Sequence, residues 1–516
     1  MKRWEFAFAA VGIVCILLGT RWIRRGELPS QESVLEEAGC RMPMTIIEPP
    51  RDVTPAGTAI LIHGLSARRR LMTYLAEDFA GHGFRAYIFD LPGHGDNRDA
   101  FNFAHAQQCA TVVVESLIRS GGIDPKTTVL VGHSMGAAIA IRMADRDPLA
   151  ATIAISPGPL VLPQRMPANL LVFSAGHDIA LLKRQAERLR EAAGGIRTQP
   201  GDFAQQRAFD LRYFPQATHT SLIFDHNVAH ESEIWAMQTL FPSIPSETLI
   251  LNADLGTYET YNQGRRRLAG VGVCLLGILL VFPLAATAAS HFARPRQPES
   301  EASPVSAVLL LSEVAACSLL AVLLLWLGVP LKFFHMLTGD YLGSVLVIVG
   351  LLLLLLNRKI SSQNFSFTGA GWFAVAILGL ATILGGGAWV NWHLRDAWLI
   401  APRWLRFAGL LPLLWIFAYA EEVTLGPVGH GWQRAFRFGI FLLARLEIWA
   451  ACVFGAYVLV SGQILVVILF VFLAAFSIIQ RLSTDAIRWR TGSPAAAALF
   501  SAILAAWFIA ALFPLT

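Results

Sequence analysis

The stretch TTVLVGHSMG at residues 127–136 decides the fold of the first half of the chain. It starts with an apolar, β-branched run, which predicts a strand buried on both faces. The end fits the pattern G-x-S-x-G, and helical spacing follows over 135–145. The turn at such a serine is so tight that side chains two positions either side would collide with neighbouring backbone. The stretch therefore predicts a strand, a sharp turn that exposes Ser134, and a helix.

Runs of the same kind recur on both sides and alternate with segments of helical spacing. The further strand-like runs are TAILIHG (58–64), RAYIFD (85–90), ATIAIS (151–156), NLLVFS (169–174) and FDLRYF (209–214). Helical spacing covers residues 70–81, 104–119, 135–145 and 180–193. Strands that helices cover on both faces are apolar throughout rather than alternating. We therefore expect an α/β domain with a doubly wound, mostly parallel sheet.

Two backbone groups near Ser134 are placed to stabilise a negatively charged oxygen. Met135 opens the predicted helix, so its N–H is free at the helix N-terminus. The tripeptide HGL at 63–65 closes the strand TAILIHG, and we expect the N–H of Leu65 to be the second oxyanion donor. We assign His63 a structural role in bracing that loop.

Three motifs together resemble one large enzyme family. ILIHGLSARRR at 60–70, IFDLPGHGDN at 88–97 and VGHSMG at 131–136 are similar to the α/β-hydrolase superfamily, specifically its lysophospholipase, monoacylglycerol lipase and serine aminopeptidase-like branch. The resemblance covers about residues 45–240. It implies an acidic residue after a strand downstream of the serine and a histidine after the last strand. Asp178 in NLLVFSAGHD and His219 in YFPQATHTSLIFD match these positions.

The order Ser134, Asp178, His219 is the order that this fold uses. In the implied mechanism His219 takes the proton of Ser134, and Asp178 fixes the imidazole tautomer and steadies its positive charge. An acyl-enzyme forms and water hydrolyses it. This chemistry needs no cofactor and no metal, and we expect neither.

Other histidines and aspartates are alternatives for these two roles: His133, His177, His226, His230, Asp202 and Asp210. The two histidines after His219 fall in a helical stretch, where surface or packing roles are favoured. The histidine beside Ser134 usually serves packing, and the one beside Asp178 is interpreted as a loop residue. The two later aspartates do not directly follow a strand, so Asp178 is preferred.

The segment between the runs at 151–156 and 169–174 is short for a relative of lipases. Many lipase-like relatives insert a cap of tens of residues there, whereas this chain has about twelve. Either the site is open, or the membrane surface or adjoining helices cover it.

The composition indicates a membrane protein. Of 516 residues, 55% are hydrophobic and 15% charged, and the long apolar runs follow residue 265. Residues 6–19 form another apolar run, with Lys2 and Arg3 before it and Arg21 after it. Because no small-residue cleavage site follows this run, we interpret it as a retained anchor rather than a signal peptide.

The predicted organisation has four parts: an anchor at 1–25, the α/β-hydrolase domain at 26–245, a linker at 246–265 and a membrane domain at 266–516. We expect about eight helical spans in the membrane domain. They are residues 268–288, 305–328, 342–356, 369–390, 406–420, 438–459, 462–480 and 495–513.

The net charge of +5 does not indicate nucleic-acid binding, because arginines cluster at the edges of apolar segments, where lipid headgroups explain them. Four of the six cysteines fall inside predicted spans. Cys40 and Cys109 are left in the soluble half, where they could pair in an oxidising compartment. No metal-ligand spacing is present.

Charged residues inside spans are candidates for function. The residues concerned are Glu313, Arg445 and Glu447 within spans and the pair Glu421-Glu422 just past the end of the fifth. The acidic pair resembles the EExxxR motif of intramembrane CAAX-type proteases, but position 426 is Gly. We favour a structural interpretation, in which Arg445 pairs with a Glu and the acidic pair faces water.

The short-loop charges favour a hydrolase domain outside the cytoplasm. Eleven basic residues lie in the segments assigned inside: Lys2, Arg3, Arg294, Arg296, Arg358, Lys359, Arg434, Arg437, Arg481, Arg488 and Arg490. Four lie in the outer short loops: Lys332, Arg395, Arg403 and Arg406. Six arginines that flank the hydrolase domain would also lie outside and oppose this assignment. A multi-pass protein of a bacterial cytoplasmic membrane is expected.

The leading hypothesis is a serine hydrolase that cleaves an ester or thioester of an acyl lipid or another membrane-associated substrate. A serine aminopeptidase-like amidase is the near alternative. A transporter or scaffold whose α/β domain binds a ligand without catalysis is the alternative from another class. Protein partners are not indicated.

Overall fold

This structure, a computed structural model, describes residues 3–24, 28–51, 53–143, 149–244, 246–292, 306–328, 333–357, 369–390, 398–426, 431–459 and 463–516. The chain forms two compact units. Trp22–Ala269 with Pro514–Thr516 make the α/β unit, and Met1–Arg21 with Gly270–Phe513 make the helical unit.

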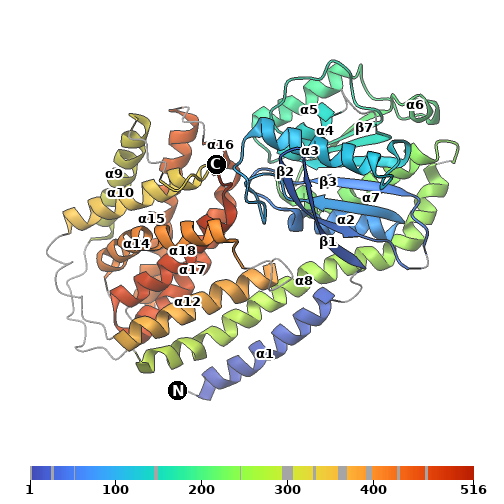
Figure 1. Cartoon of the computed structure of the whole chain (residues 1–516). Helices are drawn as coiled ribbons and strands as arrows, with labels where there is room; N and C mark the ends of the chain where they lie inside the picture. Colours follow the sequence, from blue (N-terminus) through green and yellow to red (C-terminus); the bar gives the residue numbers. More distant parts are fainter. Residues whose placement is uncertain are drawn as a thin grey trace. The chain divides into compact units, whose positions relative to one another are not determined.

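The α/β unit contains one eight-stranded sheet of order β1-β2-β4-β3-β5-β6-β7-β8 (Figure 1). Its strands are β1 Ser30–Glu37, β2 Cys40–Ile47, β3 Gly57–Ile62, β4 Phe84–Phe89, β5 Thr128–His133, β6 Ala151–Ile155, β7 Leu170–Ala175 and β8 Phe209–Phe214. From β4 to β8 in that order all pairs are parallel, whereas β2 pairs antiparallel with β1 and β4. The predicted doubly wound, mostly parallel sheet is confirmed.

Strands β1 and β2 were not predicted from the sequence. β1 reads SQESVLEE and its residues alternate between exposed and half-buried positions, so it carries no apolar run. β2 is mostly buried and lies second from the edge of the sheet, antiparallel to both β1 and β4.

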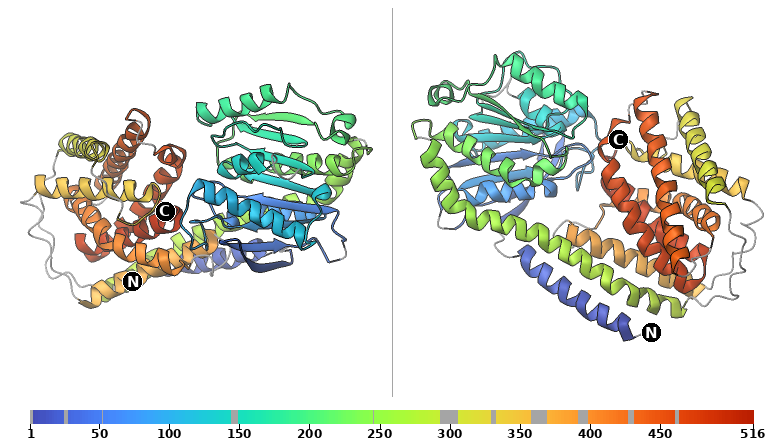
Figure 2. Two further views of the ribbon diagram at one scale, coloured as in Figure 1. Left: turned by 45° about the horizontal axis from the view of Figure 1, so that its top comes forward. Right: turned by 180° about the vertical axis from the view of Figure 1, so that it is seen from behind.

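Helices lie on both faces of the sheet (Figure 2). α2 contacts α7, and α3 contacts α4, with one pair against each face. The helices are α2 Thr73–Gly81, α3 Phe103–Arg119, α4 Met135–Met143, α5 Ala180–Ala192, α6 Pro200–Ala204 and α7 His226–Leu240, with 3-10 turns at Arg69–Met72, Pro125–Thr127 and Ser221–Phe224. The residues of β3, β5, β6 and β7 are all buried, which explains their continuous apolar sequences.

Two cross-links tie the edge hairpin to the rest of the sheet. A disulfide joins Cys40 in β2 to Cys109 in α3, with Cα atoms 5.4 Å apart. The buried Arg69 donates to Thr45 in β2 at 3.1 Å, and its guanidinium pairs with Glu32 at 3.0 Å and with Asp90. Because Arg69 follows the HGL tripeptide, this pairing also fixes the loop that leads toward Ser134.

Nine helices among the described residues are long and apolar enough to cross a membrane. The helical unit draws on α1 Arg3–Arg24, α8 Ser246–Phe292, α9 Ala307–Trp326, α10 Gly339–Leu356, α12 Gly369–Val390, α14 Ala401–Leu425, α15 Trp432–Tyr457, α16 Ile464–Ile468, α17 Phe470–Thr491 and α18 Pro494–Leu512. The expected linker at 246–265 is helical and continuous with the first of the later spans. The predicted span at 462–480 corresponds to α16 and the first half of α17. The polar second half of α17, QRLSTDAIRWR at 480–490, is also helical, so the helix ends later than predicted.

The amino-terminal helix packs closely on α8. A Cβ at Gly12 would lie 2.7 Å from the carbonyl oxygen of Gly277, and one at Gly277 would lie 2.6 Å from that of Gly12. Glu5 bonds Thr287 of α8 at 2.9 Å and pairs with Arg490 of α17 at 3.1 Å. Small residues that bring two helix backbones this close are typical of helix pairs in membranes.

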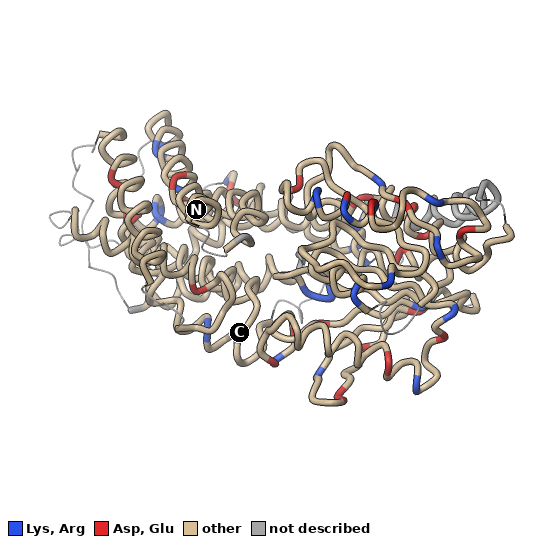
Figure 3. Tube along the Cα trace, turned by 90° about the horizontal axis from the view of Figure 1, so that it is seen from above, with Lys and Arg blue, Asp and Glu red and all other residues tan. Residues whose placement is uncertain are grey.

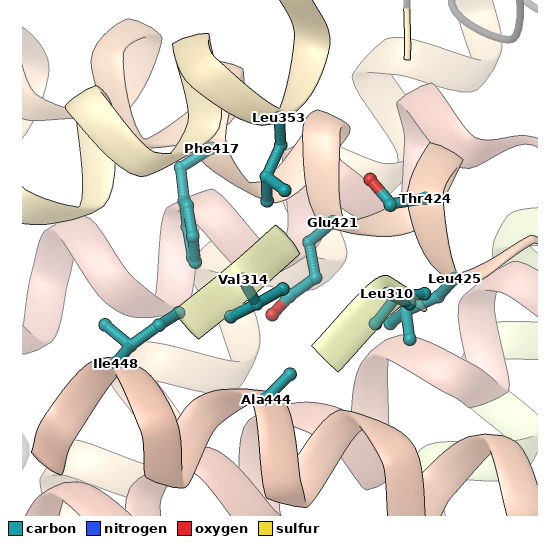
Figure 4. Close-up of a pocket in the computed structure, with 9 residues that line it drawn as sticks. All are labelled: Leu310, Val314, Leu353, Phe417, Glu421, Thr424, Leu425, Ala444 and Ile448. Carbon is teal, nitrogen blue, oxygen red and sulfur yellow. The ribbon is translucent and has the colours of Figure 1, made fainter. Parts of the chain in front are cut away.

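The acidic pair of the helical unit does not face water, which corrects the prediction. α14 extends to Leu425, so Glu421 and Glu422 lie inside it, 7% and 1% exposed. Arg445 donates to both oxygens of Glu421, at 2.6 and 2.8 Å, as the pairing hypothesis proposed. Glu421 also lines a small pocket between α9, α10, α14 and α15, where its carboxylate points among apolar side chains (Figure 4).

The second acidic residue belongs to a larger ionic cluster. Glu422 pairs with Arg437 of α15 at 3.2 Å and with Arg481 of α17, and both arginines pair with Asp485. These arginines, like Arg403 and Arg488, are buried in helices and therefore do not report the charge of loops. These four arginines therefore do not belong in the comparison of basic residues between inner and outer loops that predicted the orientation of the chain. Seven of its other members lie outside the described residues: Lys2, Arg294, Arg296, Lys332, Arg358, Lys359 and Arg395. The remaining four, Arg3, Arg406, Arg434 and Arg490, lie in helices.

Candidate active site

The turn at Ser134 has the geometry that its two glycines predict. A Cβ at Gly132 would lie 2.4 Å from backbone atoms of Gly136, and one at Gly136 would lie 2.1 Å from the carbonyl oxygen of Ile62. Ser134 itself has φ +54°, a left-handed conformation that costs free energy for any residue except glycine. Ser134 is half-buried, whereas its neighbours His133 and Met135 are buried.

The expected oxyanion donors flank this turn. Met135 is the first residue of α4, so its N–H is at the helix N-terminus. Leu65 follows Gly64, where a Cβ would lie 3.1 Å from the Cβ of Ser134. His63 braces this loop, because its Nε2 accepts from the N–H of Leu91 at 3.1 Å. The segments that carry the two predicted donors thus meet at Ser134, because Gly64 lies beside it and Met135 follows it at the start of α4.

Asp178 and His219 meet from two separate loops. Nδ1 of His219 lies 2.9 Å from Oδ2 of Asp178, and the other oxygen of Asp178 accepts from the N–H of Ile179 at 2.9 Å. Both residues are buried. Burial by itself raises the pKa of Asp178, but hydrogen bonds and attraction from His219, with a hydrogen bond from Ser156, hold the pKa below its ordinary value. The carboxyl group is therefore ionised at neutral pH.

His219 lies beside the serine turn without bonding the serine. Its ring centroid is 4.9 Å from that of His133, the residue before Ser134. Among the described residues no hydrogen bond joins the Ser134 hydroxyl to the imidazole. Since Nδ1 faces Asp178, Nε2 is the nitrogen available to the serine. Catalytic hydrogen bonds are often long before substrate binds.

His133 has a definite contact that the sequence did not reveal. Its Nε2–H donates to the carbonyl oxygen of His219 at 2.9 Å, so it holds the backbone of the histidine loop. Burial lowers the pKa of His133 to about 3, with a smaller contribution from His219. His133 is therefore neutral at physiological pH and acts as a hydrogen-bond donor to this loop.

Ser156 is a second residue that sequence reasoning missed. It follows β6, and its hydroxyl lies 3.0 Å from Nδ1 of His219 and in hydrogen-bonding contact with Oδ2 of Asp178. The available signal was its place directly after a buried strand, the same criterion that selected Asp178.

The alternative residues occupy other sites. Asp202 pairs with Arg207 at 2.9 Å, and Asp210 pairs with Arg212 at 2.6 Å. His177 and His226 are exposed, and His230 lies within α7. None of them replaces Asp178 or His219 at the serine turn in the part of the chain that the structure describes.

The segment between β6 and β7 is a short loop. Gly158 within it donates its N–H to the carbonyl of Ser134 at 2.9 Å, and a Cβ there would lie 3.3 Å from the Met135 nitrogen. Further along the loop, Val161 is 79% exposed and Leu162 38% exposed. The loop is therefore tied to the serine turn at one end and presents apolar side chains to solvent.

One group of metal-binding residue types occurs among the described residues: Cys40, His105 and Cys109. The two cysteines form the disulfide, so their sulfurs are not thiolate ligands.

The arrangement at the serine turn can activate a hydroxyl for attack on a carbonyl. It combines Ser134, the buried Asp178–His219 pair and the predicted N–H donors of Leu65 and Met135.

Comparisons with known proteins find similarity over part of the chain. Residues 59–302 match the model of the alpha/beta hydrolase family. A protein of Mycobacterium phage D29 that carries the name non-heme haloperoxidase is 27% identical over 149 residues, which cover 28% of this chain and 50% of the phage protein. The chain thus spans half the length of that relative.

Several solved structures are similar to less than half of the chain. An α/β serine hydrolase without a lid from Xanthomonas campestris is 19% identical and covers 42% of this chain and 95% of its own, with a TM-score of 0.34. A soluble variant of monoglyceride lipase from Saccharomyces cerevisiae is 12% identical and covers 42% and 97%, with a TM-score of 0.32. An esterase of Pyrobaculum calidifontis is 12% identical and covers 47% and 92%, with a TM-score of 0.34.

Proposed function

We propose that this chain, whose α/β unit matches the alpha/beta hydrolase family, is a membrane-bound serine hydrolase that cleaves esters or thioesters of acyl substrates. Ser134 is the nucleophile, His219 the general base and Asp178 the residue that orients the imidazole. The observation that carries the proposal is the buried Asp178–His219 hydrogen bond beside a serine held at φ +54°.

The reaction follows from these positions. His219 removes the proton of Ser134 as the hydroxyl attacks the carbonyl carbon, and the N–H groups of Leu65 and Met135 bind the oxygen that becomes negative. The protonated imidazole then gives its proton to the leaving alcohol or thiol. Water hydrolyses the acyl-enzyme with His219 again as the base.

An acyl substrate is favoured by the short loop after β6. This loop is too short to form the cap that encloses the substrate in many lipase-like enzymes. It exposes Val161 and Leu162, which follow Gly158, the residue whose N–H donates to the carbonyl of Ser134. Exposed apolar side chains on the loop that starts at the serine turn favour an apolar acyl group over a charged substrate. An amide-cleaving enzyme would use the same residues, so the bond type has to be measured.

The test uses the full chain in detergent or nanodiscs. A fluorophosphonate probe should label the wild type and should not label Ser134→Ala. A panel of p-nitrophenyl esters of increasing chain length, an acyl thioester and an aminoacyl amide then identifies the bond. Folded wild-type protein that neither reacts with the probe nor hydrolyses any of these would contradict the proposal and favour a ligand-binding scaffold.

We also propose that the α/β unit lies on the extracytoplasmic side of a bacterial cytoplasmic membrane. The Cys40–Cys109 disulfide supports this, because such bonds persist in oxidising compartments and are rare in the cytosol. A membrane-impermeant fluorophosphonate applied to intact cells should label Ser134. Labelling that requires permeabilised cells would place the α/β unit inside.

A further inference from the structure

Ser156 has a backbone conformation that its residue type disfavours. Its φ is +45°, although it is not glycine, and its side chain is buried, with the residue 2% exposed. The backbone is held there because its N–H donates to the carbonyl of Phe173 in β7 at 2.8 Å. A non-glycine residue with a strained backbone at such a position is a reason to look for a function of its side chain.

The hydroxyl of Ser156 contacts both members of the buried pair. A carboxylate can only accept hydrogen bonds, so the hydroxyl donates to Oδ2 of Asp178. The same oxygen of Asp178 accepts from Nδ1–H of His219 at 2.9 Å, and the hydroxyl oxygen lies 3.0 Å from that nitrogen. The Ser156 hydroxyl, Oδ2 of Asp178 and Nδ1 of His219 therefore lie within hydrogen-bonding distance of one another. The other carboxylate oxygen, Oδ1 of Asp178, accepts from the N–H of Ile179.

We propose that Ser156 is a positioning residue for the hydrolytic reaction, which fixes the carboxylate of Asp178 and the ring of His219 in the orientation that Ser134 requires. The inference rests on the proposed function of Ser134. Ser156 does not contact the reacting atoms; it acts through His219. Its burial excludes it as a second nucleophile, in contrast to the half-buried Ser134.

Two effects of the hydroxyl can be separated. It limits rotation of both partners, which keeps Nε2 of His219 aimed at the serine turn. It also draws negative charge from Asp178, which weakens the attraction of this carboxylate for a protonated imidazole. Without the hydroxyl, the base should therefore become protonated at a higher pH, and the acid limb of the rate profile should move upward.

The test compares Ser156→Ala with Ser156→Gly in the full chain. Both variants lack the hydroxyl, but glycine tolerates positive φ and removes the backbone strain, so Ser156→Gly should be the more thermostable of the two. We expect both to lower kcat by about 10- to 100-fold with little change in KM. Both should also shift the acid limb of kcat/KM to higher pH. Ser232→Ala, which removes another fully buried serine hydroxyl, in α7, is the matched control and should leave the pH profile unchanged.

The outcomes distinguish the two proposals. If Ser156→Gly keeps the wild-type kcat and pH profile, the hydroxyl has no positioning role and the inference is overturned, while the proposed function stands. If kcat falls in both variants but the acid limb stays in place and KM rises in parallel, Ser156 is merely structural. If the folded wild type neither reacts with the fluorophosphonate nor hydrolyses any substrate of the panel, the proposed function fails, and this inference fails with it.

Discussion

Both units of the chain bury charged groups, but they use them in different ways. Figure 3 shows charged residues spread densely over the α/β unit and sparsely over the helical unit. In the α/β unit, Asp178 and His219 meet at loops that follow strands, beside the half-buried Ser134. In the helical unit, Glu421 and Glu422 lie near the C-terminal end of α14. Glu421 pairs with Arg445 of α15, and Glu422 pairs with Arg437 of α15 and Arg481 of α17.

The two clusters differ in whether a polar atom remains available for proton transfer. At the sheet edge, one imidazole nitrogen is held by Asp178 and the other is available for proton transfer. In the helical unit, both oxygens of Glu421 accept hydrogen bonds from the guanidinium of Arg445, so this carboxylate is held in a buried ion pair. We therefore expect the first cluster to determine activity and the second to determine stability.

The largest expected effect is on catalysis. Asp178→Asn keeps the size of the side chain but removes the charge and favours the wrong imidazole tautomer. If the proposed function holds, the kcat for ester hydrolysis should fall by about 10⁴-fold, the loss that this substitution causes in serine proteases with a Ser-His-Asp triad. Steady-state kinetics on the full chain measure this, and thermal unfolding serves as the folding control. A variant that keeps more than a tenth of the wild-type kcat would contradict the assignment of Asp178.

The second largest expected effect is a loss of stability in the helical unit. Glu422→Ala leaves Arg437 and Arg481 buried with one acidic partner fewer, which should cost about 3–5 kcal/mol of stability. Thermal unfolding in detergent should show a lower midpoint, and the rate of hydrolysis of a short soluble ester should be unchanged as long as the chain stays folded. Loss of this activity at full stability would show that the two clusters are coupled.

A matched control for that experiment replaces a whole ion pair. Glu421→Leu combined with Arg445→Met removes both charges at once, and replacing a complete buried pair by apolar residues is often neutral or stabilising. The double variant should therefore be at least as stable as Glu421→Leu alone. If the double variant is less stable than Glu421→Leu alone, Glu421 and Arg445 do not act as an ion pair that is independent of other charged groups.

A smaller effect is expected at Asp90 in the α/β unit. Burial raises the pKa of Asp90, but Arg69, His63 and two backbone N–H groups together lower it below its ordinary value. Because the folded-state pKa is the lower one, this contribution to stability is present at neutral pH and is lost as the pH falls below about 4. Arg69→Met should destabilise the fold at pH 7 and flatten the acid part of the unfolding curve. An unchanged pH dependence would exclude this pair as its cause.

The smallest expected effect concerns His82, which pairs with Glu233 of α7 at 3.0 Å. Burial alone lowers the pKa of His82, but the carboxylate of Glu233 raises it to about 9. The raised folded-state pKa means that this stabilisation is complete below about pH 6.5 and is lost as the pH rises toward 9. Chemical unfolding at pH 6 and pH 9 should show a difference that His82→Gln reduces. An equal difference in both proteins would contradict this.

The sequence by itself determined the elements whose signals are local. The strand, tight turn and helix around Ser134 follow from an apolar run and two glycines, and the order of Ser134, Asp178 and His219 follows from motifs placed after strands. Each long apolar helix was visible as a run of the necessary length, although its ends were not, because polar residues continue α14 and α17 past the apolar part.

Only the tertiary structure decided which distant side chains meet. Ser156 is 22 residues from Asp178 and 63 from His219, and Arg481 is 59 from Glu422. Cys40 and Cys109 are joined over a separation of 69 residues, where the sequence left their pairing open. Periodicity and motif spacing report the surroundings of a residue along its own strand or helix. The partner of a buried polar group is set instead by how strands and helices pack, which no single segment contains.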